Sequence, residues 1–155
     1  MIETNLGWLR QALDLLERMD DTVYAASPAH LRHIIEFYQA FLEGAGSRQI
    51  DYDARRRDPR IERSRKAAAA AIESVMRHLR SFRALRFDAA VRVRIDNTVA
   101  KSTVGRELQF LSSHTVHHFA LIAITLRLHS VGMPPDFGVA PSTLRYQATR
   151  AAEAA

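Results

Sequence analysis

The chain has 155 residues, enough for one domain with an apolar core, and its hydrophobic fraction of 47% is typical of globular proteins. Cysteine is absent and no apolar run reaches the roughly 20 residues of a membrane span, which argues against disulfides, thiolate nucleophiles and a membrane partner and fits a cytoplasmic protein. The net charge of +5 does not indicate a nucleic-acid partner, because the densest basic run, Arg55-Arg56-Arg57, lies between Asp53 and Asp58 and favours ion pairs.

Two helices are predicted before residue 44. The first covers residues 2–20, because apolar side chains recur there at intervals of three and four residues: Ile2, Leu6, Leu9, Leu13 and Leu16. The second begins at Ser27-Pro28, with serine as the N-cap and proline at the first helical position, and runs to Leu42 or Glu43. His33 lies on a stripe of apolar and small residues of this helix, so we expect it to point inward.

The polar segment from residue 50 to Pro59 is predicted to be a loop or a short turn of helix. Its charges have two interpretations. In the first they are simply solvated. In the second they form the rim of a pocket, where Asp53 orients a metal-bound histidine and Arg56 clamps an anionic substrate. Under the second interpretation Tyr52, Asp53 and Arg56 are the candidates for orienting a small-molecule substrate.

A third helix and a short strand or hairpin are predicted next. The helix runs from about Arg60 to Ser81 and includes an alanine run at residues 67–71, which has high helix propensity. Apolar and charged residues then alternate with a period of two from Val91 to Asn97, which predicts strand pairing.

The fourth helix is predicted at about residues 102–131, capped by serine or threonine at its start. It carries three of the chain's seven histidines. His114 and His118 are one turn apart, so their rings leave the same face and could share a metal ion. His117 lies about 100° around the helix from His118, so its pairing with His114 is the second choice.

The C-terminal segment is predicted to be irregular. Residues 132–146 are rich in proline and glycine yet carry Phe137 and Tyr146, which favours an ordered strap lying across the helices. Residues 147–155 are expected to fray. The chain is therefore interpreted as one domain over residues 1–146, followed by a short tail.

Four helices with a long connection near residues 44–59 predict an all-α four-helix bundle. Such bundles bind metals with inward side chains on facing helices, and His33 would join His114 and His118 in that role. Three protein ligands and an open position are the pattern of catalytic zinc, and imidazole also suits nickel and iron. Thr115 stands where a zincin protease has glutamate, which excludes that class.

This combination resembles the DinB-like family of metal-dependent bundles. The resemblance rests on a serine-capped second helix that contains histidine and on the His-x-x-His-His motif at residues 114–118. It implies that His33, His114 and His118 bind a divalent metal, zinc or nickel before iron. The family includes transferases that use low-molecular-weight thiols, members without known activity, and many dimers. Phe119-Ala120 replaces the family's usual Gly-Gln after the histidine pair.

The expected function is that of a divalent-metal-binding bundle, acting on a small molecule as a metal-dependent hydrolase or as a thiol-dependent transferase. The alternative is a non-catalytic homodimeric module for binding or stress response. Two ligand choices stay open in the sequence. His30 lies one turn before His33 on the same stripe, and His117 competes with His118.

Overall fold

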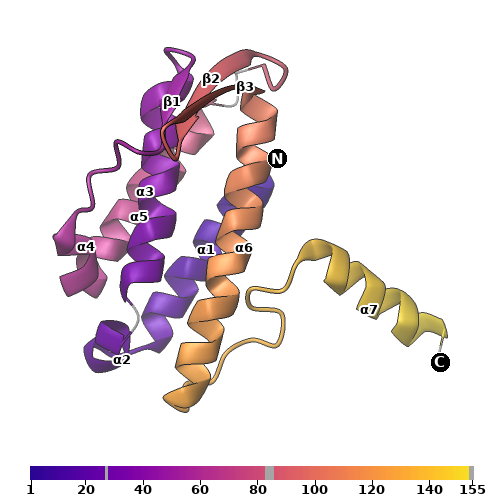
Figure 1. Cartoon of the computed structure of the whole chain (residues 1–155). Helices are drawn as coiled ribbons and strands as arrows, with labels where there is room; N and C mark the ends of the chain where they lie inside the picture. The colour runs from indigo at the N-terminus through magenta and orange to yellow at the C-terminus, as the bar shows by residue number, and fades with distance from the viewer. Residues whose placement is uncertain (27, 83–85, 154–155) are drawn as a thin grey trace.

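The computed structural model describes residues 1–26, 28–82 and 86–153. Within these ranges the chain is mostly helical, with a small three-stranded sheet (Figure 1). The helices are α1 (Ile2–Arg18), α2 (Asp21–Ala26), α3 (Pro28–Ala45), α4 (Pro59–Arg63), α5 (Arg65–Ser81), α6 (Val104–Leu128) and α7 (Pro141–Glu153). The strands are β1 (Gln49–Asp51), β2 (Ala90–Ile95) and β3 (Thr98–Thr103). The predicted all-α class therefore holds in broad terms.

The four long helices enclose the apolar core. Both α1 and α3 pack against α5 and α6. Their inward residues follow helical spacing, as the sequence predicted for the first helix. The largest fully buried side chains on these helices are Leu6, Leu9, Ile34, Ile35, Tyr38, Phe41, Ile72, Leu79, Leu108 and Phe119. No helix of the described residues is long and apolar enough to cross a membrane.

The starts of the helices agree with the predicted caps where these are described. α3 begins at Pro28, whereas its predicted cap, Ser27, lies outside the described residues. The Thr103 side chain caps α6 by accepting a hydrogen bond from the N–H of Arg106. The long fourth helix was therefore correctly located, although it ends three residues before the predicted Val131.

The predicted third helix is two helices. Ser64 interrupts it with extended backbone, and its hydroxyl accepts from the N–H of Ala67 at 3.2 Å, which caps α5. The Ser64 N–H donates to the carbonyl of Arg60, which ends α4. A serine can start a new helix in this way because its side chain replaces a backbone hydrogen bond.

The sheet lies across one end of the helices, next to the end of α3 and the start of α6 (Figure 1). The predicted hairpin is confirmed: β2 and β3 pair antiparallel through Asp96 and Asn97, whose φ angles of 49° and 59° suit a two-residue turn. β1 pairs parallel with β2, and its residues Ile50 and Asp51 belong to the segment that was predicted to be a loop or a short turn of helix.

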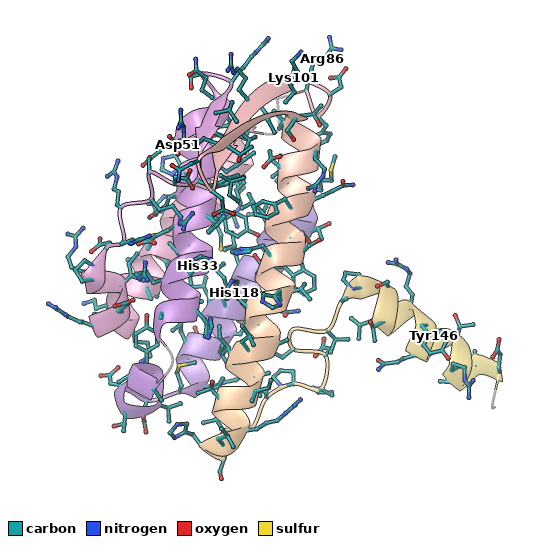
Figure 2. The ribbon with its side chains drawn as sticks, in the orientation of Figure 1. His33, Asp51, Arg86, Lys101, His118 and Tyr146 are labelled. Atoms are coloured by element: carbon teal, nitrogen blue, oxygen red, sulfur yellow. The ribbon has the colours of Figure 1, made fainter. Side chains whose placement is uncertain are left out.

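The C-terminal segment differs from its prediction. Phe137 is buried and stacks on Phe119 at 4.7 Å, so the first part does lie across α6. From Pro141 to Glu153 the chain is helical, because no further proline or glycine follows Pro141 and alanine is frequent. Helix α7 buries no residue and points away from the other helices, and Figure 2 shows Tyr146 on it, far from His33. The division into a domain and a tail stays a prediction.

Candidate metal centre

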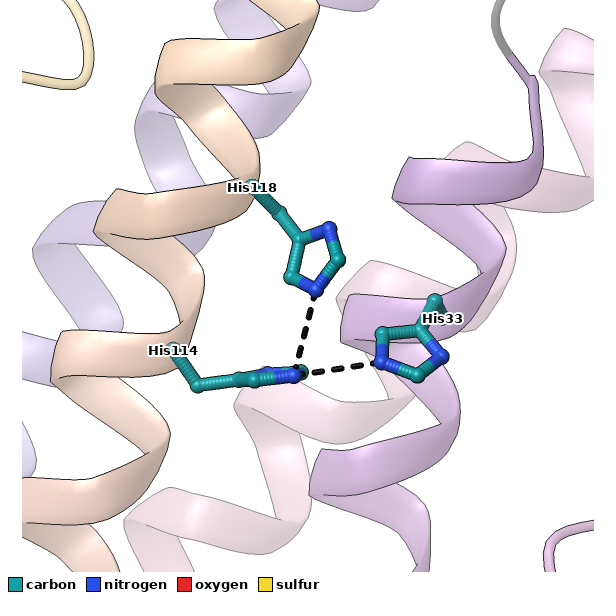
Figure 3. Close-up of side chains that lie close together, drawn as sticks. All are labelled: His33, His114 and His118. Atoms are coloured by element: carbon teal, nitrogen blue, oxygen red, sulfur yellow. Dashed lines mark hydrogen bonds between the residues drawn. The ribbon is translucent and has the colours of Figure 1, made fainter.

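The structure brings His33 together with His114 and His118 between α3 and α6 (Figure 3). The Nε2 atom of His114 lies 3.1 Å from that of His33 and 3.2 Å from that of His118. Each of the three side chains offers a nitrogen within 4.8 Å of the other two. Sequence spacing predicted the pair on α6, and the packing of α3 against α6 adds the third ring.

Aromatic side chains hold the rings in place. The ring of Phe37, one turn after His33 on α3, lies 4.6 Å from the His33 ring and 4.2 Å from the His114 ring, centroid to centroid. The centroid of the Phe110 ring lies 5.4 Å from that of the His114 ring, on the same face of α6. Phe37 and Phe110 form an aromatic wall that covers the cluster on the side that faces the sheet, while each histidine keeps part of its surface exposed. The cluster is therefore half-buried.

The competing histidines have distinct positions. His30 places its Nδ1 3.0 Å from the Nδ1 of His118, which leaves the Nε2 of His118 directed at His114. His117 was the second choice in the sequence for pairing with His114. It is exposed, and its ring only meets the edge of the His118 ring at 5.2 Å. His30 therefore contacts a cluster member, while His33 belongs to the cluster.

The three imidazoles are neutral near pH 7. Burial, together with the charges of Arg55 and Arg32, lowers the pKa of His33 to about 4. Burial and the neighbouring rings likewise lower the pKa of His114 to about 4 and that of His118 to about 3. Neutral imidazole is the form that donates a lone pair to a metal ion.

The nitrogen atoms suit a divalent ion in number and spacing. Tetrahedral ligands about 2.0–2.1 Å from zinc lie about 3.3 Å from one another, close to the two separations measured here. The Nδ1 atom of His114 is buried and has no hydrogen-bond partner. It faces the aromatic wall, where ligating histidines usually have a carboxylate or carbonyl partner. The donor set fits a metal, and the buried Nδ1 of His114 lacks the usual outer partner.

The loop residues that the sequence proposed for substrate orientation make other contacts. The carboxylate of Asp53 accepts hydrogen bonds from the N–H groups of Asp96 and Asn97, both at 2.9 Å, and so holds the hairpin turn. Arg56 is exposed and forms an ion pair with Glu43 at 2.9 Å. Their predicted roles at a catalytic site remain predictions.

Tyr52 is the third of these loop residues, and it lies in the aromatic wall. Its ring stacks on Phe37 at 5.0 Å. Its hydroxyl donates to the carboxylate of Glu107 at 3.0 Å. Burial and the charge of Glu107 raise the pKa of Tyr52, so the phenol stays protonated. Its role in substrate orientation also remains a prediction.

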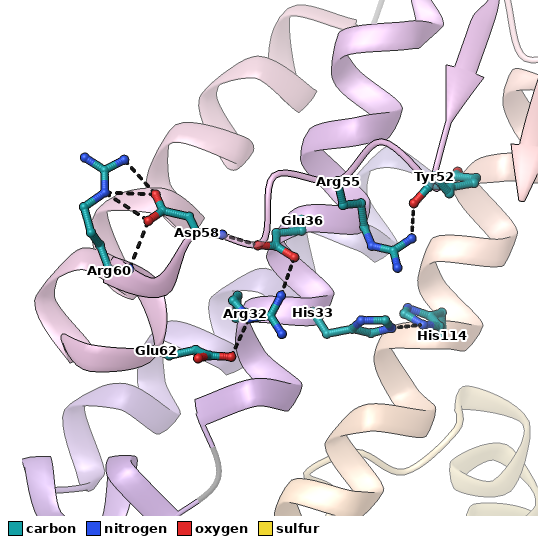
Figure 4. A network of polar contacts seen from close by, with 9 residues as sticks. All are labelled: Arg32, His33, Glu36, Tyr52, Arg55, Asp58, Arg60, Glu62 and His114. Carbon is teal, nitrogen blue, oxygen red and sulfur yellow. Dashed lines mark hydrogen bonds and ion pairs between the residues drawn. The ribbon is translucent and has the colours of Figure 1, made fainter. Parts of the chain in front are cut away.

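A buried ion-pair network beside the cluster was not predicted (Figure 4). Arg32 bridges Glu36 and Glu62 at 2.7 Å and 2.5 Å, and Glu36 also accepts the N–H of Asp58 at 2.6 Å. Glu36 is only 1% exposed, which is unusual for a carboxylate. In the sequence, the spacing of four residues between Arg32 and Glu36 could have indicated this ion pair.

Arg55 was also missed. Its guanidinium carbon lies 4.1 Å from the centroid of the Phe37 ring, and its Nη1 donates to the carbonyl of Tyr52. Figure 4 shows the guanidinium between Tyr52 and the His33–His114 pair. No periodicity distinguishes Arg55 from Arg56 in the sequence, because the loop has no regular repeat.

Comparison with known proteins gives two matches. The model of the DinB superfamily matches residues 9–122, which is more than half of the chain and includes all three clustered histidines. A protein of the fungus Rhizopus delemar (strain RA 99-880), FK506-binding protein 5, is 29% identical over 154 residues. That alignment covers 94% of this chain and 37% of the fungal protein, so the chain spans well under half of that relative. No solved structure matches the chain significantly.

Proposed function

Because the chain belongs to the DinB superfamily, we propose that it binds a divalent metal ion through His33, His114 and His118. The observation that carries this proposal is the convergence of three neutral imidazoles from two facing helices within 4.8 Å. We further propose that the four long helices are the four-helix bundle of this superfamily. In that arrangement the site occupies the interior face between α3 and α6, as in other metal-binding bundles.

Zinc and nickel are the proposed ions, with iron as the next choice. Three imidazoles without a carboxylate suit zinc and nickel, whereas hard oxygen ligands would favour magnesium or calcium. We propose that His30 orients the imidazole ring of His118. A hydrogen bond between their Nδ1 atoms keeps the Nε2 lone pair of His118 available to the ion.

The proposed activity is that of a metal-dependent hydrolase or a transferase that uses a low-molecular-weight thiol. When bound, a divalent metal lowers the pKa of a water or thiol at its open position and so supplies a nucleophile near neutral pH. The chain contributes the three neutral ligands and a wall formed by Phe37 and Phe110, which excludes water on one side. Each of the three histidines keeps part of its surface exposed, and we propose that a small-molecule substrate approaches the ion from there.

A second candidate function is a non-catalytic homodimeric binding module. It is favoured by two apolar side chains that α6 leaves in solvent, Ile124 at 55% and Leu128 at 81% exposure. Surfaces of this kind often mark interaction sites. A homodimer is also compatible with the catalytic proposal, so metal binding decides between the two more directly than oligomeric state does.

Elemental analysis of untagged protein, purified without chelator and then supplied with zinc or nickel, tests the metal site. We expect near-stoichiometric metal in the wild type and its loss in the His33→Ala, His114→Ala and His118→Ala variants. The His30→Ala variant should keep the site but bind zinc about 10- to 100-fold more weakly, as removal of an outer hydrogen-bond partner usually does.

The matched control is His78→Ala. His78 is exposed on α5, and its ring bonds to the Ser74 carbonyl of its own helix, so this variant should bind metal like the wild type. A wild type that takes up no metal, or three ligand variants that keep it, would refute the proposed site. Circular dichroism of each variant shows whether loss of metal follows from loss of fold.

A further inference from the structure

Arg55 is a cation placed beside the histidine cluster by the loop after β1. Its guanidinium lies on the ring of Phe37, and that same ring contacts both His33 and His114. The hydrogen bond from its Nη1 to the Tyr52 carbonyl fixes the orientation of the guanidinium plane.

In the described part of the chain no carboxylate forms an ion pair or a hydrogen bond with Arg55, although the charges of Glu36 and Asp53 act on its guanidinium from further away. Among the described residues the Tyr52 carbonyl is its hydrogen-bond acceptor, and its Nε is buried without a partner. Glu36 contributes to the electrostatics of Arg55 but is already bonded to Arg32 and to the N–H of Asp58. A half-buried guanidinium with unused donors is costly unless an anion completes its hydrogen bonds.

The histidine cluster itself contains no carboxylate. With a divalent ion held by neutral imidazoles, the centre would carry two positive charges, and Arg55 would add a third beside it. Such a site favours an anion in the open position over a neutral ligand. Arginine suits a carboxylate in particular, because its planar donors match the two oxygens.

We propose that Arg55 forms an anion-binding subsite next to the metal centre and recognises the carboxylate of a small-molecule ligand. This inference rests on the proposed metal site and names the class of substrate for it. It assigns to Arg55 the role that the sequence suggested for Arg56, which is exposed and paired with Glu43.

Acetate titration of the cobalt-loaded full-length protein tests this subsite, with the visible absorption of cobalt as the readout. Acetate should bind the wild type and change the spectrum. The Arg55→Met variant keeps an apolar side chain over Phe37 but loses the charged donors, so its acetate affinity should fall about 10- to 100-fold, the range for hydrogen bonds to a charged group. Arg55→Lys should give an intermediate affinity, because it retains the charge without the planar donors.

The matched control is Arg56→Met, which removes the neighbouring exposed arginine and should leave acetate affinity unchanged. Equal acetate affinities in the wild type and in Arg55→Met, with cobalt bound to both, would overturn the subsite and leave the metal site intact. Failure of the wild type to bind cobalt would overturn the metal site and this subsite together. Arg55→Lys keeps the test decisive if Arg55→Met does not fold.

Discussion

Buried imidazoles govern the pH response expected of the metal-free protein. In the folded chain His33 and His114 have pKa values of about 4, and His118 of about 3, because burial disfavours their charged forms. In the unfolded chain histidine returns to about 6.5. Between these values the unfolded chain binds more protons, so the free energy of unfolding increases with pH.

The contribution of these histidines to stability is thus complete above about pH 6.5 and is lost as the pH falls toward 4. We expect the Tm of the metal-free protein to decrease across this window. The decrease should be smaller in His118→Gln, which cannot take up a proton at this position. His129→Gln, a change at an exposed residue, is the control and should follow the wild type. Identical pH slopes for wild type and His118→Gln would contradict this assignment.

At the scale of elements, a close approach between α3 and β1 positions the loop that carries Arg55. A Cβ atom at Gly44 would lie 2.3 Å from the backbone oxygen of Gln49, closer than any side chain tolerates. Gly44 therefore lets the chain turn directly from α3 into β1. The pairing of β1 with β2 then directs the next residues toward the cluster.

Gly44→Ala should lower the free energy of unfolding by about 1–3 kcal/mol, because backbone atoms have to move to admit the methyl group. The measurement is urea denaturation followed by circular dichroism. Gly46→Ala is the matched control, since nothing lies within 4 Å of a Cβ atom there. Equal midpoints for the two variants would show that β1 does not need this close approach.

For the whole molecule, the contacts of the C-terminal segment end before its helix. Phe137 is 7% exposed and stacks on Phe119, and Gly138 crosses α6 with a φ of 68°. A side chain at Gly138 would be strained by that backbone angle and would meet Phe119 at 2.9 Å. The stabilising contacts thus belong to the strap, while α7 is free of the core.

Removal of residues 141–155 should change the free energy of unfolding by no more than about 0.5 kcal/mol, because α7 buries no residue. Phe137→Ala should lower it by about 3–5 kcal/mol, the usual cost of deleting a buried phenylalanine. Both values come from urea denaturation of the purified variants. A large loss of stability on removal of α7 would mean that this helix packs against the protein in solution.

The sequence by itself determined the features that depend on local periodicity. Helical spacing located α1, α3 and α6, alternation located β2 and the turn that follows it, and the four-residue spacing of His114 and His118 put both rings on one face. These features could be predicted because the direction of each side chain in a regular helix or strand follows from its position along the chain. The DinB resemblance, confirmed by the match over residues 9–122, rests on the same motif.

Only the tertiary structure decided which partners meet across elements. His33 rather than His30 completes the cluster, because the packing of α3 on α6 sets the depth of each turn. Arg55 rather than Arg56 faces the cluster, because β1 pairs with a strand some 40 residues away and this pairing orients the following loop. The same strand pairing brings the carboxylate of Asp53 to the hairpin turn, where it accepts a hydrogen bond from the N–H of Asp96. Such contacts join residues distant in the chain, and no local pattern encodes them.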